Sequence, residues 1–229
     1  MSVLYLYALV SSPPRGDLGR GLRRERLEIL PGRGFQVILG RMEAPPDAPT
    51  PGVIRRHDAT IRRIVAATDA VLPMRFGAIV ADEDAATQAL MPRARELARR
   101  LRHVRAREQM TLRLFSSRTP SRPERPLPPT GTRLGPGARY LTARARQSAR
   151  VEPSELGPIR LALRGLVADE RVQCHATPPL VASVYHLVPR GVSARYRRRV
   201  VQAARGLAAL RLTVSGPWPP YAFGDDAWR

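Results

Sequence analysis

The chain opens on eight consecutive hydrophobic residues, Val3–Val10, and this run constrains the fold more than any other feature. A short continuous apolar run that is bounded by turn residues is typical of a buried strand. The turn-forming cluster Ser11–Asp17, with the sequence SSPPRGD, follows directly. We therefore expect Val3–Val10 to be the central strand of a β-sheet.

The segments that follow alternate between strand and helix patterns. Residues Arg26–Met42 predict two short strands around a proline-glycine turn at Pro31–Gly34. Residues Val53–Asp69 show helical periodicity with a largely apolar stripe. Three more segments are a strand within Ala70–Asp82, an amphipathic helix within Glu83–Val104 and an alternating strand over Met110–Phe115. This order predicts a small α+β sandwich with helices on one face of the sheet.

A proline-rich segment, residues 117–136, separates the two halves of the chain. It contains few apolar residues, so it predicts a linker or a loop without a core of its own. Beyond it the patterns indicate helices within 135–170, strands at Val172–Ala176 and Leu180–Val188, a helix over Ser193–Leu207 and a strand over Leu210–Gly216. We expect a first α+β domain at 1–116, the linker at 117–136, a second α+β domain at 137–214 and a tail at 215–229.

The tail carries three aromatic residues within a proline-rich stretch, SGPWPPYAFGDD at Ser215–Asp226. Proline fixes φ and removes an amide donor, so PWPPY is biased toward an extended polyproline path and away from a helix or a central strand. Burial of Trp218, Tyr221 and Phe223 would contribute on the order of 2 kcal/mol each. We favour a tail packed against the folded protein; a partner-binding segment and a disordered end are the alternatives.

The net charge of +20 suggests an anionic partner such as nucleic acid. All 39 basic residues are arginine, however, which a codon bias toward G and C would produce without selection for phosphate binding. The run Arg195–Val200, RYRRRV, surrounds a predicted helix whose other side is apolar, and no aromatic stacking platform accompanies it. An arginine-rich nucleic-acid-binding protein is thus the alternative function and nucleic acid the less favoured partner.

The cysteine count and the hydropathy of the chain argue against disulfide-bonded, membrane-spanning and secreted proteins. Cys174 is the single cysteine, which excludes an intrachain disulfide and favours a small buried thiol. No run approaches the roughly 20 apolar residues of a membrane span, and the first residues lack the pattern of a signal peptide. We expect a cytoplasmic protein without a membrane partner.

The strongest candidate for catalysis or metal binding is the pair His57 and Asp58, because adjacent His and Asp residues supply two ligands in metal-dependent phosphohydrolases. The other ligands of such a set are missing, so a partly buried histidine with a hydrogen-bond partner is the preferred interpretation. The acidic run Asp82–Asp84 sits at a predicted helix start, where carboxylates stabilise the helix dipole. We expect no enzyme activity, no catalytic residue, no cofactor and no metal.

Two segments resemble motifs of the GvpL/GvpF family of gas vesicle proteins. The segment His57–Asp84 is similar to a central motif in which a histidine and an acidic residue open a helix that leads into a V-L-P-x-R-F-G strand. The segment Leu210–Phe223 is similar to a closing G-P-W-P-P-Y-x-F motif, and GPGARYL resembles the start of a central helix. The resemblance extends from YLYALV at the N-terminus to the tail.

The resemblance implies two α+β domains, the first ferredoxin-like and the second a modified ferredoxin-like domain, followed by a folded-back C-terminal tail. It also implies a non-catalytic minor gas vesicle protein, located at the gas vesicle within the prokaryotic cytoplasm. Such a protein binds the major shell protein, with other minor gas vesicle proteins as further candidate partners, and supports nucleation and assembly. The family-motif residues, with a structural or partner-contact role, are His57, Asp58, Leu72, Pro73, Arg75, Phe76, Gly77, Gly216, Pro217, Trp218, Pro219, Pro220, Tyr221 and Phe223.

Overall fold

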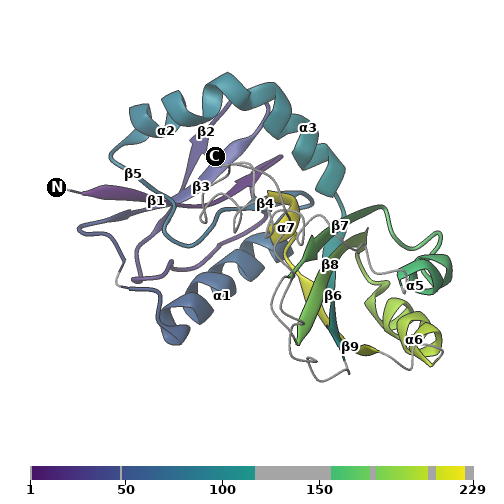
Figure 1. The fold of residues 1–229 in the computed structure, drawn as a ribbon. Coiled ribbons are helices and arrows are strands. Elements are labelled where there is room, and N and C mark those ends of the chain that lie inside the picture. Colours follow the sequence, from purple (N-terminus) through teal and green to yellow (C-terminus); the bar gives the residue numbers. More distant parts are fainter. Residues whose placement is uncertain (1, 47, 117–155, 176–178, 206–209, 225–229) are drawn as a thin grey trace, which may run out of the picture. The chain divides into compact units, whose positions relative to one another are not determined.

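The computed structural model describes residues 2–46, 48–116, 156–175, 179–205 and 210–224. The chain forms two compact units, each described by itself (Figure 1). Unit 1 contains Met1–Gln109 together with Pro217–Arg229, and unit 2 contains Met110–Gly216. The predicted linker at 117–136 and the helix expected near its end lie outside the described residues.

The sheet of unit 1 has the strand order β2-β3-β1-β4, with β5 also paired to β1 (Figure 1). Its strands are β1 (Val3–Val10), β2 (Leu27–Pro31), β3 (Gln36–Met42), β4 (Val71–Pro73) and β5 (Ile79–Val80). β1 pairs antiparallel with β3, β4 and β5, which confirms its central position. The register of β1 against β3 shifts between Leu6 and Ala8, so Tyr5, Tyr7, Ala8 and Val10 belong to one core cluster.

Helices cover both faces of this sheet, and the expectation of helices on one face was wrong. The helices are α1 (Pro51–Ala67), α2 (Glu83–Leu90) and α3 (Ala94–Val104), with a short 3-10 turn at Met91–Arg93 before α3. Figure 1 shows α1 on one side of the sheet and α2 and α3 on the other. The cause lies in β1, whose buried residues face both ways and therefore need cover on both sides.

The starts of α1 and α2 follow ordinary capping chemistry. Thr50 caps α1 by accepting a hydrogen bond from the Val53 amide at 3.4 Å. Asp82 caps α2 by accepting from the Ala85 amide at 2.8 Å, and Glu83 lies in the first turn. The capping interpretation of the acidic run is confirmed. On α1, Ile54 is an exception to the burial of apolar side chains, at 45% exposed.

The sheet of unit 2 has the strand order β7-β8-β6-β9. The described elements in chain order are β6 (Arg107–Ser116), α5 (Leu156–Ala162), β7 (Asp169–Cys174), β8 (Leu180–Pro189), α6 (Ser193–Ala204) and β9 (Leu210–Trp218). β6 supplies Met110, Leu112 and Leu114 to the core of this unit. The sequence had placed this strand in the first domain, because an alternating pattern identifies a strand but not the strands beside it.

Both sheets have the strand order of the ferredoxin-like βαββαβ fold, since the order 2-3-1-4 recurs in each unit. In unit 2, α5 and α6 lie in the two helical connections. In unit 1, residues 11–26 join β1 to β2 without a helix. Unit 1 therefore departs from the βαββαβ order at its first connection. The fold is therefore α+β with two ferredoxin-like units.

The C-terminal segment folds back onto unit 1. β9 continues through Pro217 to Trp218, and a short helix, α7 (Tyr221–Gly224), contacts β4. The expected extended path holds through Trp218 in this edge strand, and it ends at the bend at Pro220, after which the chain enters α7. β9 lies at the edge of its sheet, where a proline needs no ladder partner for its missing amide. No helix in the described parts of the chain is long and apolar enough to cross a membrane.

Candidate functional site

Residues from both family motifs meet in unit 1, where α7 docks against α1 and β4. The Tyr221 hydroxyl donates to Oδ1 of Asp58 at 2.9 Å. Asp58 also accepts from Nε of Arg62 at 2.7 Å, and the Arg62 guanidinium lies 4.8 Å from the centre of the Trp218 ring. We call this group, with Phe223 and Gly224, the tail-docking site.

The backbone of α7 is held by one side chain from outside the helix and by a hydrogen bond within its own turn. The Ala222 amide donates to Oε1 of Gln109 at 2.8 Å. The Phe223 amide donates to the carbonyl oxygen of Pro220 at 3.1 Å, and the Phe223 side chain is only 2% exposed. A methyl group on Gly224 would lie 3.1 Å from the carbonyl oxygen of Pro73, so this position favours the smallest residue. Gly224 of α7 therefore lies close against β4.

The aromatic residues of the tail are buried unequally. Phe223 is fully buried, Tyr221 and Trp218 are half-buried, and Pro219 and Pro220 are buried beside them. The expectation that Trp218 is shielded like a core residue is therefore corrected. One face of its indole ring meets the Arg62 guanidinium, a cation–π contact that leaves part of the ring in solvent.

His57 lies one residue before Asp58 but points into the core. Its Nδ1 lies 3.0 Å from the Tyr5 hydroxyl, and that hydroxyl accepts from the Gly77 amide at 3.1 Å. A tyrosine hydroxyl has one proton, so it donates to Nδ1 when the neutral ring carries its own proton on Nε2. Burial lowers the pKa of His57, while the Met74 backbone and Asp58 oppose that shift. The sequence predicted a partly buried, hydrogen-bonded histidine; the hydrogen bond to Tyr5 is present, and the ring is more deeply buried than expected, at 4% exposed.

Two further aromatic rings, Tyr7 and Phe76, pack around this hydrogen bond between Tyr5 and His57. The Tyr5 and Tyr7 rings lie 4.8 Å apart, and the His57 ring stacks on Tyr7 at 5.8 Å. Phe76 meets His57 edge-on at 5.7 Å. Tyr7 also donates to Glu25 and accepts from the Leu22 amide at 2.7 Å. Through these ring contacts, α1, β1 and the loop after β4 pack against one another.

Burial suppresses ionisation of these hydroxyls. It raises the pKa of Tyr5 to about 12, partly opposed by the Gly77 amide, and raises that of Tyr7 with help from Glu25. Burial also raises the pKa of Tyr221, and the Asp58 carboxylate adds to the shift. The three tyrosines are therefore neutral donors over the whole physiological pH range.

His57 and Asp58 do not converge on a common ligand. The imidazole bonds to Tyr5 in the core, whereas the carboxylate bonds to Tyr221 and Arg62 at the tail. Among the described residues no cluster of three or more His, Cys, Asp or Glu side chains could hold a metal ion. The chemistry of this pair is structural hydrogen bonding at two different places.

The remaining motif residues occupy defined positions. Leu72 and Pro73 are buried in β4 opposite Leu9 and Ala8 of β1. Arg75 is exposed, and its carbonyl oxygen accepts from the Ala78 amide at 3.2 Å. Gly77 has a φ of +83°, a backbone conformation that favours glycine.

Gly216 and Pro217 precede the docked helix on β9. Gly216 has a φ of +114°, and its carbonyl oxygen accepts a hydrogen bond from Arg197 of α6. Pro217 is exposed. The structure thus brings Asp58, Pro73 and the tail residues together, whereas Arg75 and Gly216 lie outside the tail-docking site.

Sequence reasoning missed several partners in unit 1. Tyr5 and Tyr7 were assigned only to a buried strand, and Gln109 and Glu25 were not singled out. Two tyrosines at alternate positions of a buried strand were a usable signal, because each buried hydroxyl needs a partner.

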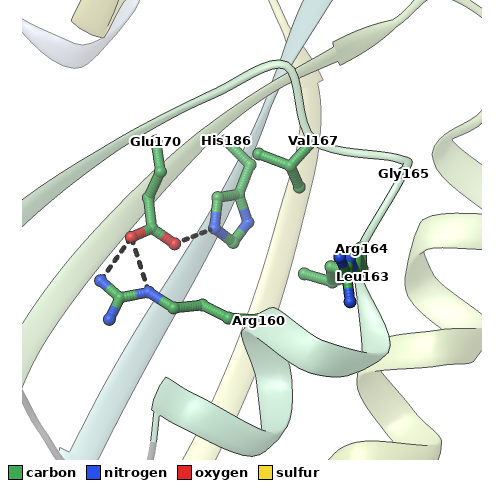
Figure 2. Close-up of a pocket in the computed structure, with 7 residues that line it drawn as sticks. All are labelled: Arg160, Leu163, Arg164, Gly165, Val167, Glu170 and His186. Atoms are coloured by element: carbon green, nitrogen blue, oxygen red, sulfur yellow. Dashed lines mark hydrogen bonds and ion pairs between the residues drawn. The ribbon is translucent and has the colours of Figure 1, made fainter.

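Sequence reasoning also missed a polar network in unit 2 (Figure 2). His186, only 1% exposed, lies with Nε2 2.7 Å from Oε2 of Glu170 and Nδ1 2.6 Å from the Tyr196 hydroxyl. Arg160 donates to the other Glu170 oxygen at 2.9 and 2.6 Å. The contact from His186, and then that from Arg160, lowers the pKa of Glu170 to about 2. No local sequence pattern links these residues, which come from four elements.

Comparisons with known proteins agree with this architecture. The sequence model of the family described as gas vesicle synthesis protein GvpL/GvpF matches residues 3–225. The crystal structure of the gas vesicle protein GvpF from Anabaena sp. PCC7120 matches with a TM-score of 0.72 and 17% identity, over 98% of this chain and 96% of that chain. GvpF from Microcystis aeruginosa matches with a TM-score of 0.72 and 15% identity, over 97% of this chain and 98% of that chain. None of the curated protein sequences compared with the chain matches it.

Proposed function

This chain belongs to the GvpL/GvpF family of gas vesicle synthesis proteins, and we propose that it is a non-catalytic minor protein of gas vesicle assembly. In this proposal it acts at the gas vesicle within the cytoplasm, binds the major shell protein and supports nucleation of the shell. The observation that carries the proposal is the family match over residues 3–225, which leaves no large part of the chain for an unrelated activity.

The roles of the motif residues support a structural protein rather than an enzyme. His57 is buried against Tyr5, and Asp58 bonds to Tyr221 and Arg62, so both acid–base side chains are engaged in the fold. We propose that the family-motif residues build and brace unit 1, and that the shell protein binds elsewhere on the surface. Their role would then be to hold the C-terminal segment in place.

Deletion of the gene in its native host tests the assembly role. The expected result is loss or sharp reduction of gas vesicles by electron microscopy, while immunoblots still detect the major shell protein. A hydrophobic shell subunit without a starting surface should aggregate or be degraded. Restoration by the wild-type gene is the control, and normal vesicle number and shape in the deletion strain would contradict the proposal.

Co-purification tests the proposed contact with the shell protein. Affinity-tagged protein should retain the major shell protein at physiological salt and also at raised salt. A tagged arginine-rich protein of similar net charge is the matched control, because charge alone gives binding that salt removes. Equal recovery with both baits would contradict a specific contact.

The alternative of nucleic-acid binding rests on the net charge of +20. Nonspecific phosphate contacts weaken steeply as salt rises, whereas sequence-specific or tight binding persists. We expect only the weak, salt-sensitive kind. Tight binding to DNA or RNA at physiological salt would favour this alternative. A hydrolase is a separate alternative. Elemental analysis that finds one zinc, manganese or iron per chain, lost in His57→Ala, would favour it.

A further inference from the structure

Unit 2 contains a pocket that neither the family motifs nor the proposed function uses. It has a volume of about 310 Å³, near the lower end of the roughly 300 to 1,000 Å³ typical of small-ligand sites. Figure 2 shows the lining residues, which are Arg160, Leu163, Arg164, Gly165, Val167, Glu170 and His186. They come from α5, the turn after it and strands β7 and β8.

The polar wall of this pocket is fixed in place before any ligand binds. Each Glu170 oxygen already has a partner, one from Arg160 and the other from His186. His186 is held on its other nitrogen by Tyr196, which is fully buried. A wall whose side chains are locked in this way costs little ordering entropy when a ligand binds.

The turn that carries Arg164 is also braced. Arg199 of α6 donates from one nitrogen to the carbonyl oxygens of Ala162 and Arg164, each at 3.2 Å. The backbone of the pocket is therefore connected to α6 as well as to the sheet. Arg164 reaches the pocket from a turn with a defined position.

The charge of the lining selects the class of ligand. Arg160 and Arg164 carry two positive charges, and Glu170 carries one negative charge that Arg160 and His186 already contact. A single positive charge therefore remains to be balanced. Leu163 and Val167 add apolar walls, which suit the methylene groups of an organic acid better than a fully hydrated inorganic ion.

We propose that this pocket binds a carboxylate group, with the Arg164 guanidinium as its main partner. A planar guanidinium matches a planar carboxylate through two parallel hydrogen bonds. Phosphate fits less well, because its second negative charge would face Glu170.

The carboxylate has two possible sources, a small organic acid or an acidic side chain of a protein partner. The proposal does not depend on gas vesicle assembly, so a failed deletion phenotype and an empty pocket would be separate results. The direct probe is N-acetylglutamate α-amide, which presents one side-chain carboxylate. N-acetylglutamine α-amide has the same shape without the charge and is the matched control.

The experiment is a titration of the isotopically labelled full-length protein at pH 7 and constant ionic strength, followed by NMR. We expect saturable shifts of the Gly165 and Val167 amides and of the His186 ring with the carboxylate probe, and none with the amide control. Glutarate and the peptide acetyl-Leu-Glu-Leu-amide then compare the two sources. Tighter binding of glutarate assigns a free organic acid, and tighter binding of the peptide assigns a protein side chain.

Two charge-matched variants test the role of Arg164. Arg164→Gln should weaken binding of the probe at least about tenfold, since a charge-assisted bidentate contact is lost. Arg198→Gln removes an exposed arginine of α6 outside the pocket and should leave the affinity unchanged. If Arg164→Gln does not fold, Arg164→Lys keeps the charge without the fork and should still weaken binding. Absence of saturable shifts, equal shifts with the amide control, or equal weakening in both arginine variants would overturn the proposal.

Discussion

The Tyr221 hydroxyl donates a hydrogen bond to the Asp58 carboxylate across 163 residues of chain. This contact joins the two segments that resemble family motifs, and it explains why an acidic residue follows His57 on α1. The imidazole serves the core and the carboxylate serves the docked helix α7. Motif residues that look like a catalytic pair in the sequence therefore act as two separate structural contacts.

Phe223 should contribute more to stability than Trp218. Phe223 is 2% exposed, so Phe223→Ala should cost about 3 to 5 kcal/mol and lower the melting temperature by roughly 10 °C. Trp218 is half-buried under Arg62, and Trp218→Ala should cost only about 1 to 2 kcal/mol. Denaturant unfolding of the isolated protein measures the free-energy loss of each variant, and thermal unfolding measures its melting temperature. Thr213→Ala, at an exposed site on β9, is the control.

The same measurements separate a docked helix from a free binding segment. If both aromatic variants melt like the parent but fail to retain the shell protein, the tail residues are partner contacts. Such a result would contradict the docked position of α7, because the predicted loss of stability requires no partner. A larger effect for Trp218 than for Phe223 would contradict the burial order.

The hydrogen bond between Tyr221 and Asp58 should appear as a coupling energy. Tyr221→Phe removes only the hydroxyl, and we expect a loss of about 1 kcal/mol because the acceptor is charged but partly exposed. A double-mutant cycle with Asp58→Ala, which removes the acceptor, should give a coupling of similar size. Tyr185→Phe breaks a solvent-exposed bond to Gln173 and should change stability by less than about 0.5 kcal/mol. Additive effects of the Tyr221 and Asp58 variants would show that the bond contributes nothing.

The close approach of α7 to β4 gives a third prediction. Alanine is normally favoured over glycine in a helix by about 1 kcal/mol, and Gly157→Ala in α5 meets no atom within 4 Å. Gly224→Ala places its methyl group 3.1 Å from the Pro73 carbonyl oxygen, so it should instead cost about 1 kcal/mol or more. Chemical denaturation should show a higher free energy of unfolding for Gly157→Ala and a lower one for Gly224→Ala than for the parent protein. Stabilisation by both substitutions would mean that the helix does not press on β4.

The sequence predicted most strands and helices because their signals are local. The apolar run of β1, the turn at Pro31–Gly34 and the cap at Asp82 each depend on neighbouring residues. It did not predict the sheet to which β6 belongs, since the strands beside it are distant in the chain.

At the candidate site, too, contacts between residues distant in the chain were not predicted. The family resemblance identified Asp58 and Tyr221, but not their contact, because their spacing in the chain carries no geometry. The sequence predicted burial of Trp218 and Phe223 alike, but Trp218 is half-buried, because its exposure depends on how the tail meets Arg62. The network around His186 was missed for a similar reason, because its members come from four elements.

The pH dependence of stability should report on His57. Burial lowers its pKa below the ordinary value of 6.5, so the folded protein binds a proton there less readily than the unfolded chain does. The contribution of neutral His57 to the free energy of unfolding is therefore complete above about pH 6.5. It falls as the pH drops below that value, by at most about 1.4 kcal/mol per pH unit. Glu170, with its pKa lowered to about 2 from an ordinary 4.5, adds its own loss only at more acidic pH.

Free energies of unfolding measured between about pH 5 and pH 8 test this expectation. In the parent protein the free energy of unfolding should rise with pH over this window, because the unfolded chain binds more protons. His57→Gln removes the titrating ring, so the variant should be less stable at neutral pH and show a shallower rise. His103→Gln, on the exposed side of α3, is the matched histidine control. An unchanged slope in His57→Gln would mean that the imidazole is protonated equally in the folded and unfolded chain, which contradicts its burial against Tyr5 and Tyr7.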